Sequence, residues 1–212
     1  MKGYARIMEH PLVYRVWMAP FAERKLAPFI AHNDVSRARR VLDVGCGPGT
    51  NTEHFSGANY LGIDINSAYI ESARARHRRE FIVADVTTYE VAPDQSVDMI
   101  FANSLFHHID TANTRRILAH LATLLADDGH VHIIDLVLPA KASIPRFLAK
   151  ADRGEYPRPL EEWREIFTQS FEPVVFEPYS VGAGGVALWD FVYFKGRARP
   201  EISRHGIKGG ES

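Results

Sequence analysis

The sequence predicts an α/β protein built on a doubly wound sheet of seven strands, mostly parallel, with an antiparallel strand at its C-terminal edge. Two observations carry this prediction. Short β-rich runs alternate with longer helix-compatible stretches, a pattern typical of a parallel sheet with helices on both faces. In addition, a glycine-rich turn at residues 45–49 directly follows the first of these runs.

Each element follows from its local pattern of apolar residues. The first five β-rich runs are 40–44, 60–64, 80–84, 97–101 and 130–134. Residues 67–78 and 113–126 predict helices, the second because its apolar residues share one helical face. The later runs 173–176 and 188–194 lack a long helix between them, so we expect an antiparallel pair at the sheet edge.

The chain is predicted to form one domain with two attached segments, since 212 residues suit a single sizeable core. Residues 1–38 are expected to form an N-terminal lid, because residues 10–30 are apolar and aromatic and prolines at 11, 20 and 28 divide them into short helices. Residues 39–196 form the main domain, with a cover inserted at about 139–168, where charge, Gly and Pro are dense. Residues 197–212 are expected to be a flexible tail.

Composition and charge exclude several classes of protein. Hydrophobic residues make up 46% and charged residues 24%, which argues against disorder. A net charge of -1 provides no general attraction for nucleic acid. Residues 1–40 hold eight Lys or Arg and three acids, so a basic lid could draw an anionic substrate or make a weak contact with a membrane surface; a solvated surface is the favoured alternative.

Cysteine usage predicts the cellular compartment. Cys46 is the only cysteine, so the chain can form neither an intrachain disulfide nor a Cys-rich zinc site. The N-terminus lacks the pattern of a signal peptide, and no run of about 18 apolar residues occurs. We therefore expect a cytoplasmic protein.

The glycine-rich turn is the most informative segment. Gly45 and Gly47 permit backbone angles and a close ligand approach that a Cβ would obstruct, and Gly49 is expected to relieve contact at the start of a helix. A dinucleotide-binding fingerprint would need its third glycine at Thr50, so that template fails. Asp43 lies two residues before the first glycine, where its carboxylate could orient the loop or receive the ammonium end of a ligand.

The segment 41–51 resembles the first motif of class I S-adenosylmethionine-dependent methyltransferases, in their small-molecule (type 11, UbiE-like) branch, and the resemblance extends over about 39–135. It implies a Rossmann-like fold and S-adenosylmethionine as cofactor. Asp64 would accept the ribose hydroxyls, Asp85 the adenine amino group, and the Val86 amide would serve the adenine ring. The whole expected cofactor set is Asp43, Gly45, Cys46, Gly47, Gly49, Asp64, Ile65, Asp85, Val86 and Asn103.

A fourth motif, 97–109, resembles the segment that borders the reactive methyl group in this family. It reads Asn103-Ser104-Leu105-Phe106 where nucleic-acid amino methyltransferases carry an Asn/Asp-Pro-Pro-aromatic sequence, so a nucleobase substrate is disfavoured. His107 and His108 follow, and either could serve as the base that a hydroxyl or phenol acceptor requires. Adjacent side chains point to different sides, so at most one faces the substrate; His108 is favoured, and the other would cap or pack.

A metal site is not expected. His130 and His132 alternate on a strand and could face one side, with Asp135 three residues further on, but such residues more often finish a sheet edge, and no His-Glu-x-x-His pattern is present.

For the acceptor pocket, the candidates are Tyr14, Trp17, Arg153 and Tyr156. Arg153 and Arg158 could clamp a carboxylate or phosphate, or pair with nearby glutamates in a surface network, which is the favoured alternative.

Taken together, we expect methyl transfer to a small-molecule or lipid-like acceptor, at oxygen. Two alternatives stay open. An NAD(P)-dependent oxidoreductase would use the same sheet, although Thr50, Asp85 and the lack of a Tyr-x-x-x-Lys pair speak against it. A non-catalytic S-adenosylmethionine-binding scaffold would keep the fold, although its acids and glycines would not all be intact. The oligomeric state is left open.

Overall fold

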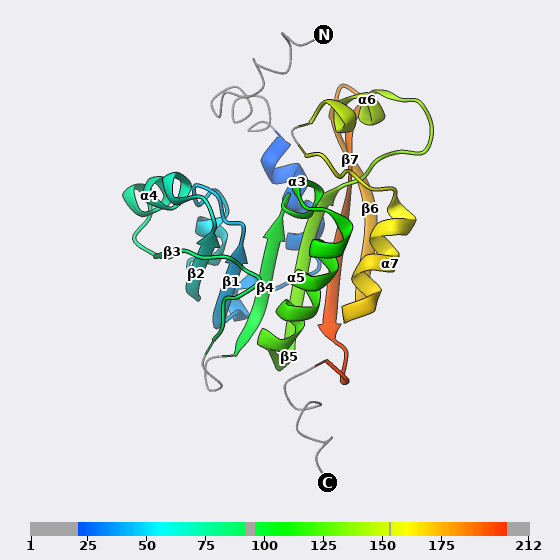
Figure 1. The fold of residues 1–212 in the computed structure, drawn as a ribbon. Helices are drawn as coiled ribbons and strands as arrows, with labels where there is room; N and C mark the ends of the chain where they lie inside the picture. The colour runs from blue at the N-terminus through cyan, green and yellow to red at the C-terminus, as the bar shows by residue number, and fades with distance from the viewer. Residues whose placement is uncertain (1–20, 92–95, 153, 203–212) are drawn as a thin grey trace.

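The sheet has seven strands in the order β3-β2-β1-β4-β5-β7-β6, in a computed structural model that describes residues 21–91, 96–152 and 154–202 (Figure 1). The strands are β1 (Arg40–Val44), β2 (Asn59–Asp64), β3 (Glu80–Val83), β4 (Val97–Asn103), β5 (Leu125–Leu136), β6 (Phe171–Ala183) and β7 (Val186–Ala198). Strands β1 to β5 pair in parallel and β7 pairs antiparallel with both β5 and β6. The predicted mostly parallel sheet is thus confirmed. The antiparallel strand β7 lies one position inside the edge, which β6 forms.

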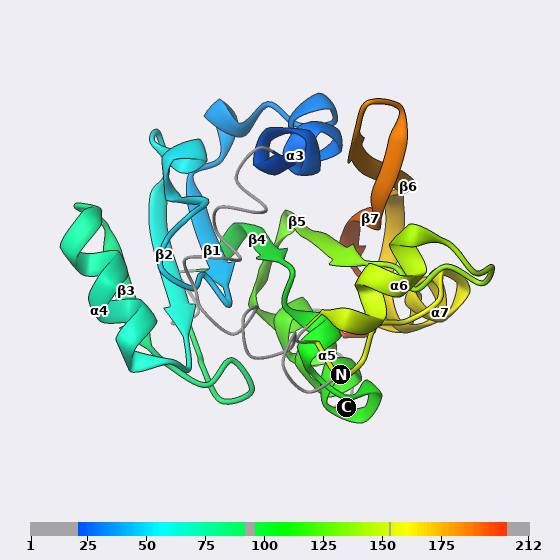
Figure 2. The ribbon, with the colours of Figure 1, turned by 90° about the horizontal axis from the view of Figure 1, so that it is seen from above.

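Helices cover both faces of the sheet, as predicted. They are α3 (Ala22–Ala31), α4 (Ser67–Arg76), α5 (Thr111–Leu124), α6 (Ile144–Ala151) and α7 (Leu160–Ser170), with 3-10 turns η2 (Val35–Arg37), η3 (Thr52–Phe55) and η5 (Phe106–His108). Figure 2 shows α3 on one side of the sheet and α5 with α7 on the other. Side chains cap the N-termini of α4 and α5. Asn66 accepts from two backbone amides at the start of α4, and Asp110 accepts from the Asn113 amide at the start of α5.

Strand β4 shows how the sheet divides the core. Its residues alternate, so that Ile100 and Ala102 pack in the cluster that holds α5 and α7, while Met99 and Phe101 pack in the cluster that holds α3. On the α3 side, the Phe29 ring lies 4.9 Å from the Phe101 ring. Both faces of the central strands are therefore buried, which leaves their carboxyl ends as the place for a ligand.

Three local features differ from expectation. Helix α3 runs through Pro28, because burial of Pro28 and Phe29 against the sheet compensates for the hydrogen bond that proline cannot donate. The helix expected after the glycine turn is only the single turn η3, since β2 already begins at Asn59. The helix expected over 113–126 ends at Leu124, since β5 already begins at Leu125 and has a register irregularity opposite the start of β4.

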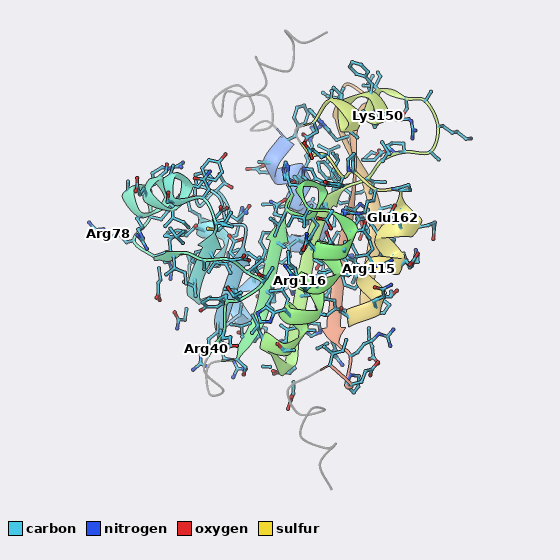
Figure 3. The ribbon with its side chains drawn as sticks, viewed as in Figure 1. Arg40, Arg78, Arg115, Arg116, Lys150 and Glu162 are labelled. Atoms are coloured by element: carbon cyan, nitrogen blue, oxygen red, sulfur yellow. The ribbon has the colours of Figure 1, made fainter. Side chains whose placement is uncertain are left out.

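Several predicted features fall outside the described residues: 1–20 of the lid, with Tyr14 and Trp17, then Arg153, and 203–212 of the tail. Among the described helices, none is both long and apolar enough to cross a bilayer. Figure 3 shows Lys150 of α6 at the end of the molecule to which β4 points, and Arg40 of β1 at the opposite end. Helix α6 of the predicted cover thus lies at the carboxyl ends of the parallel strands, whereas α7, most of which the predicted 139–168 includes, packs with α5 on a face of the sheet (Figure 2).

Candidate active site

The glycine turn leaves an open face beside the end of β1. Gly45 and Gly47 have φ of +67° and +54°, a region that residues with a Cβ rarely adopt. A Cβ at Gly45 would lie 2.7 Å from Leu105 Cδ1, whereas a Cβ at Gly47 would meet nothing within 4 Å. The turn therefore packs tightly at Gly45 and is open at Gly47.

The other two turn residues in the expected set face the protein. A Cβ at Gly49 would lie 2.9 Å from the His77 ring, so this glycine allows close packing. The Cys46 thiol is buried in the core beside Gly62, and burial raises its pKa. Cys46 thus offers a ligand only its backbone.

Asp64 ties the turn to the end of β2. Its Oδ2 accepts from the Gly47 amide at 2.9 Å and its Oδ1 accepts from the Asn66 amide at 2.8 Å. Next to it, Ile65 is 73% exposed, the highest value among the large apolar side chains that the structure describes. A carboxylate beside an uncovered apolar side chain suits a ligand with both hydroxyls and an aromatic ring.

Asp85 and Val86 follow β3 along the same edge of the sheet. Asp85 is exposed, and its Oδ1 accepts from the Thr87 amide at 2.8 Å, which lowers its pKa. Val86 is half-buried. The carboxylate therefore stays ionised and available as an acceptor.

Two buried oxygens at this edge lack a hydrogen-bond partner among the described residues: Asp43 Oδ1 and Asn103 Oδ1. The other Asp43 oxygen accepts from the Tyr60 hydroxyl at 2.7 Å, and Asn103 donates to Asn51 at 3.2 Å. Burial raises the pKa of Asp43 to about 7, although the Tyr60 hydrogen bond opposes the shift. Unsatisfied buried acceptors are costly, so a ligand that donates here would relieve the cost.

These features fit S-adenosylmethionine. Its ammonium group is a donor that the free oxygens of Asp43 and Asn103 would accept. Asp64 would take the ribose hydroxyls, and Ile65 with the Asp85–Val86 segment would take the adenine. The ten residues expected from the sequence thus lie on three neighbouring strand ends and the end of β4, with Cys46 and Gly49 turned inward.

His107 lies between two carboxylates after β4. Its Nδ1 is 2.6 Å from Asp135 Oδ1, and its Nε2 is 3.3 Å from Asp152 Oδ1. Burial favours the neutral ring, but the charges and hydrogen bonds of Asp135 and Asp152 outweigh it and raise the pKa of His107 to about 9. His107 is therefore a cation at neutral pH, and the expectation of a base at this position passes to His108 alone.

The cover segment is docked on the same histidine. The Tyr156 amide donates to the His107 carbonyl at 2.9 Å, and a Cβ at Gly154 would lie 2.1 Å from the His107 ring. Asp152 also lines, with Gly154 and Lys150, a hollow of about 470 Å³ in the cover segment. Tyr156 is 40% exposed. His107 thus connects the end of β4 to the segment that contains Gly154 and Tyr156, which the sequence predicts as a cover.

His108 is exposed, and its ring lies 4.1 Å from the His107 ring. One ring nitrogen of His108, one ring nitrogen of His107 and one carboxylate oxygen of Asp152 lie within 4.8 Å of one another. The metal candidates from the sequence are not brought together: His132 bonds the Tyr193 hydroxyl at 3.0 Å, whereas Asp135 pairs with His107.

Arg158 is used inside the protein. Its guanidinium donates to the carbonyls of Phe106 and Ile109 at 2.9 and 2.6 Å, and pairs with Glu162 at 3.5 Å. The expected pairing with a nearby glutamate is thus found at Glu162, but the Arg158 side chain is buried and is not part of a surface network. Arg158 instead holds the segment after β4 in place.

Sequence reasoning missed Lys25, which it counted only in the charge of the lid. The Lys25 side chain is buried, its ammonium donates to Ser104 Oγ, and it lies 5.0 Å from the centre of the Phe191 ring. Helical periodicity could have predicted the burial of Lys25, because it lies four residues before the buried Phe29 and so shares its face of α3.

Comparisons with known proteins agree with this geometry. Residues 41–129 match the family described as "Methyltransferase domain". The chain is 30% identical to a trans-aconitate 2-methyltransferase of Delftia acidovorans over 188 residues, which cover 80% of this chain and 68% of the relative. It is 35% identical to the same enzyme of Paracidovorax citrulli over 103 residues, which cover 45% of this chain and 38% of the relative.

Among solved structures, the fold is similar to that of the N-methyltransferase NodS from Bradyrhizobium japonicum WM9 in complex with S-adenosyl-L-homocysteine. The TM-score is 0.61 at 17% identity, covering 91% of this chain and 90% of NodS. None of these comparisons supports the oxidoreductase or scaffold alternatives. Because the sequence relatives and the sheet order agree, the chain belongs to the class I S-adenosylmethionine-dependent methyltransferases that act on small molecules.

Proposed function

We propose that this methyltransferase transfers the methyl group to a carboxylate oxygen of a small organic acid. The observation that carries the proposal is the state of His107, whose ring nitrogens both face carboxylates and whose pKa is raised to about 9. A cationic imidazole cannot remove a proton from a hydroxyl or phenol, so His107 is excluded as the base and only the exposed His108 is left for that role. A carboxylic acid has a pKa near 4, so its oxygen is already a nucleophile at neutral pH and requires no base.

The names of the relatives support the same class of acceptor. Both sequence relatives are trans-aconitate 2-methyltransferases, and aconitate is a carboxylic acid. The alignments cover 68% and 38% of those proteins, so the acceptor is proposed as a class, a small organic acid, and not as one compound.

Methyl transfer requires the protein to position the reactants, and it requires few reactive side chains. S-adenosylmethionine supplies a methyl group on a positively charged sulfur, and the transfer leaves a neutral thioether. Asp43 and Asn103 would hold the ammonium end, and the cover segment docked on His107 would exclude water from the site. Exclusion of water and in-line positioning supply the rate enhancement for such a displacement.

A panel of acceptors tests the proposal. The protein is incubated with S-adenosylmethionine and with acids, phenols or amines of similar size, and release of S-adenosylhomocysteine is measured. We expect turnover with acids and a product that mild alkali hydrolyses to methanol, as a methyl ester requires. A methylated product that resists alkali would contradict carboxylate methylation.

The remaining histidine gives a second test. With an acid acceptor, His108→Asn should keep turnover within a few-fold of the wild type, since no proton is removed. A loss of turnover of about 100-fold or more is the effect expected of a general base, and it would favour a hydroxyl acceptor over a carboxylate.

A further inference from the structure

Lys25 is a buried cation at the carboxyl end of β4. Its side chain is 7% exposed, and its ammonium donates to Ser104 Oγ. No described Asp or Glu forms an ion pair with it; Asp135 and Asp152 influence it from farther away and are themselves paired with His107. A buried ammonium has three protons to donate, and burial without a direct anionic partner is costly.

The surrounding contacts hold Lys25 in this position. The Tyr179 hydroxyl donates to the Lys25 backbone carbonyl at 2.5 Å, and the Phe191 ring lies under the ammonium at 5.0 Å. Burial lowers the pKa of Lys25 to about 8, while the more distant charges of Asp135 and Asp152 oppose the shift. The side chain is thus predominantly charged at neutral pH and is fixed by three separate elements.

Ser104 shows independent signs of a functional role. Its φ is +56°, the only positive φ of a non-glycine residue in the part of the chain that the structure describes. Such strain is retained where a site depends on it. Ser104 directly follows Asn103, whose buried Oδ1 belongs to the expected cofactor site, and the Ser104 amide donates to the Ile134 carbonyl at 2.8 Å.

We propose that Lys25 and Ser104 form the binding site for a carboxylate of the acceptor, beside the cofactor at the end of β4. The inference rests on the proposed function for the identity of the acceptor. A bound carboxylate provides the anionic partner that the buried ammonium lacks among the described residues, and the Ser104 hydroxyl orients it. Because hydrogen bonds to an ammonium reduce the nucleophilicity of a carboxylate, the methyl group goes to a second carboxylate, and di- or tricarboxylic acids are preferred to monocarboxylic acids.

Direct binding tests the site without requiring turnover. Trans-aconitate, citrate, succinate and acetate are titrated by calorimetry into the full-length protein saturated with S-adenosylhomocysteine. We expect the di- and tricarboxylates to bind the wild type and Lys25→Met to weaken them by about 10- to 100-fold, the range for loss of a charge-assisted hydrogen bond. The affinity for S-adenosylhomocysteine itself should change less than two-fold.

Two further variants separate binding from folding. Ser104→Gly suits the positive φ, so it should fold at least as well as the wild type and still weaken the acids. Lys195→Met makes the same substitution on β7, where Lys195 lies opposite His132 in the register with β5. This variant should leave the affinity for the acids unchanged. For any acid that is methylated, Lys25→Met should raise KM far more than it lowers kcat.

The outcomes distinguish this inference from the proposed function. If the wild type binds the acids, Lys25→Met does not, and no methyl ester forms, the carboxylate site stands and carboxylate methylation fails. Equal binding by wild type and Lys25→Met would overturn the site, and so would failure of the wild type to bind any of the four acids.

Discussion

Replacing His107 should reveal a pH-dependent contribution to stability. The pKa of His107 is about 9 in the folded protein against 6.5 for an unperturbed histidine, a difference that corresponds to about 3 kcal/mol. Because the folded pKa is raised, this contribution is fully present below pH 6.5 and is lost as the pH rises through 9. His107→Gln also leaves Asp135 buried without its cation, so we expect a loss of about 3–5 kcal/mol near pH 6.

The measurement is urea unfolding of wild type and His107→Gln at intervals from pH 6 to pH 10. Asp43 and Lys25 also titrate in or near this range, with pKa values of about 7 and 8, but both proteins contain them. The difference between the two unfolding free energies therefore isolates His107, and it should shrink as the pH approaches 9. As a matched control, His54→Gln changes an exposed histidine and should alter stability by less than about 0.5 kcal/mol.

Two results would refute this reasoning. One is a stability difference that stays constant from pH 6 to pH 10. The other is an NMR titration of histidine-labelled wild type in which the His107 ring titrates near 6.5, a measurement that does not depend on whether the variant folds.

Three further predictions concern the cofactor edge and the core. Asp43→Asn should weaken S-adenosylmethionine binding by about 10- to 100-fold in calorimetry. Only the wild type should release protons on binding near pH 7, because the bound ammonium lowers the raised pKa of Asp43. Equal proton release by the wild type and the variant would contradict the assignment. Gly45→Ala should destabilise the protein by about 1–3 kcal/mol, because its φ is +67° and its Cβ would clash with Leu105. The loss should exceed that of Gly184→Ala, whose Cβ would meet nothing within 4 Å. Equal losses of the two variants in urea unfolding would count against the packing argument. Trp163→Ala should cost about 3–5 kcal/mol in the same assay, since the buried indole also donates to the Leu136 carbonyl at 2.9 Å; a loss below 1 kcal/mol would mean that the site collapses around the cavity.

Much of the fold, and the place of the candidate cofactor residues in it, was predictable because it is encoded locally. Strand β1 forms at 40–44 as expected, since a short buried run followed by glycines specifies both a strand and its end. Asp43, Asp64 and Asp85 were expected at one edge because the carboxyl ends of parallel strands meet there, and the sheet order places their three strands side by side.

The sequence by itself thus determined the strands of the sheet and the edge at which Asp43, Asp64 and Asp85 gather, because each depends on periodicity and spacing within short segments. Only the tertiary structure decided which charges meet. Lys25 reaches Ser104 across 79 residues of chain, and His107, not its neighbour, is enclosed by Asp135 and Asp152. Such pairs depend on how helices and cover segments pack over the sheet, so residue type and local pattern could not separate the buried cation His107 from the exposed His108.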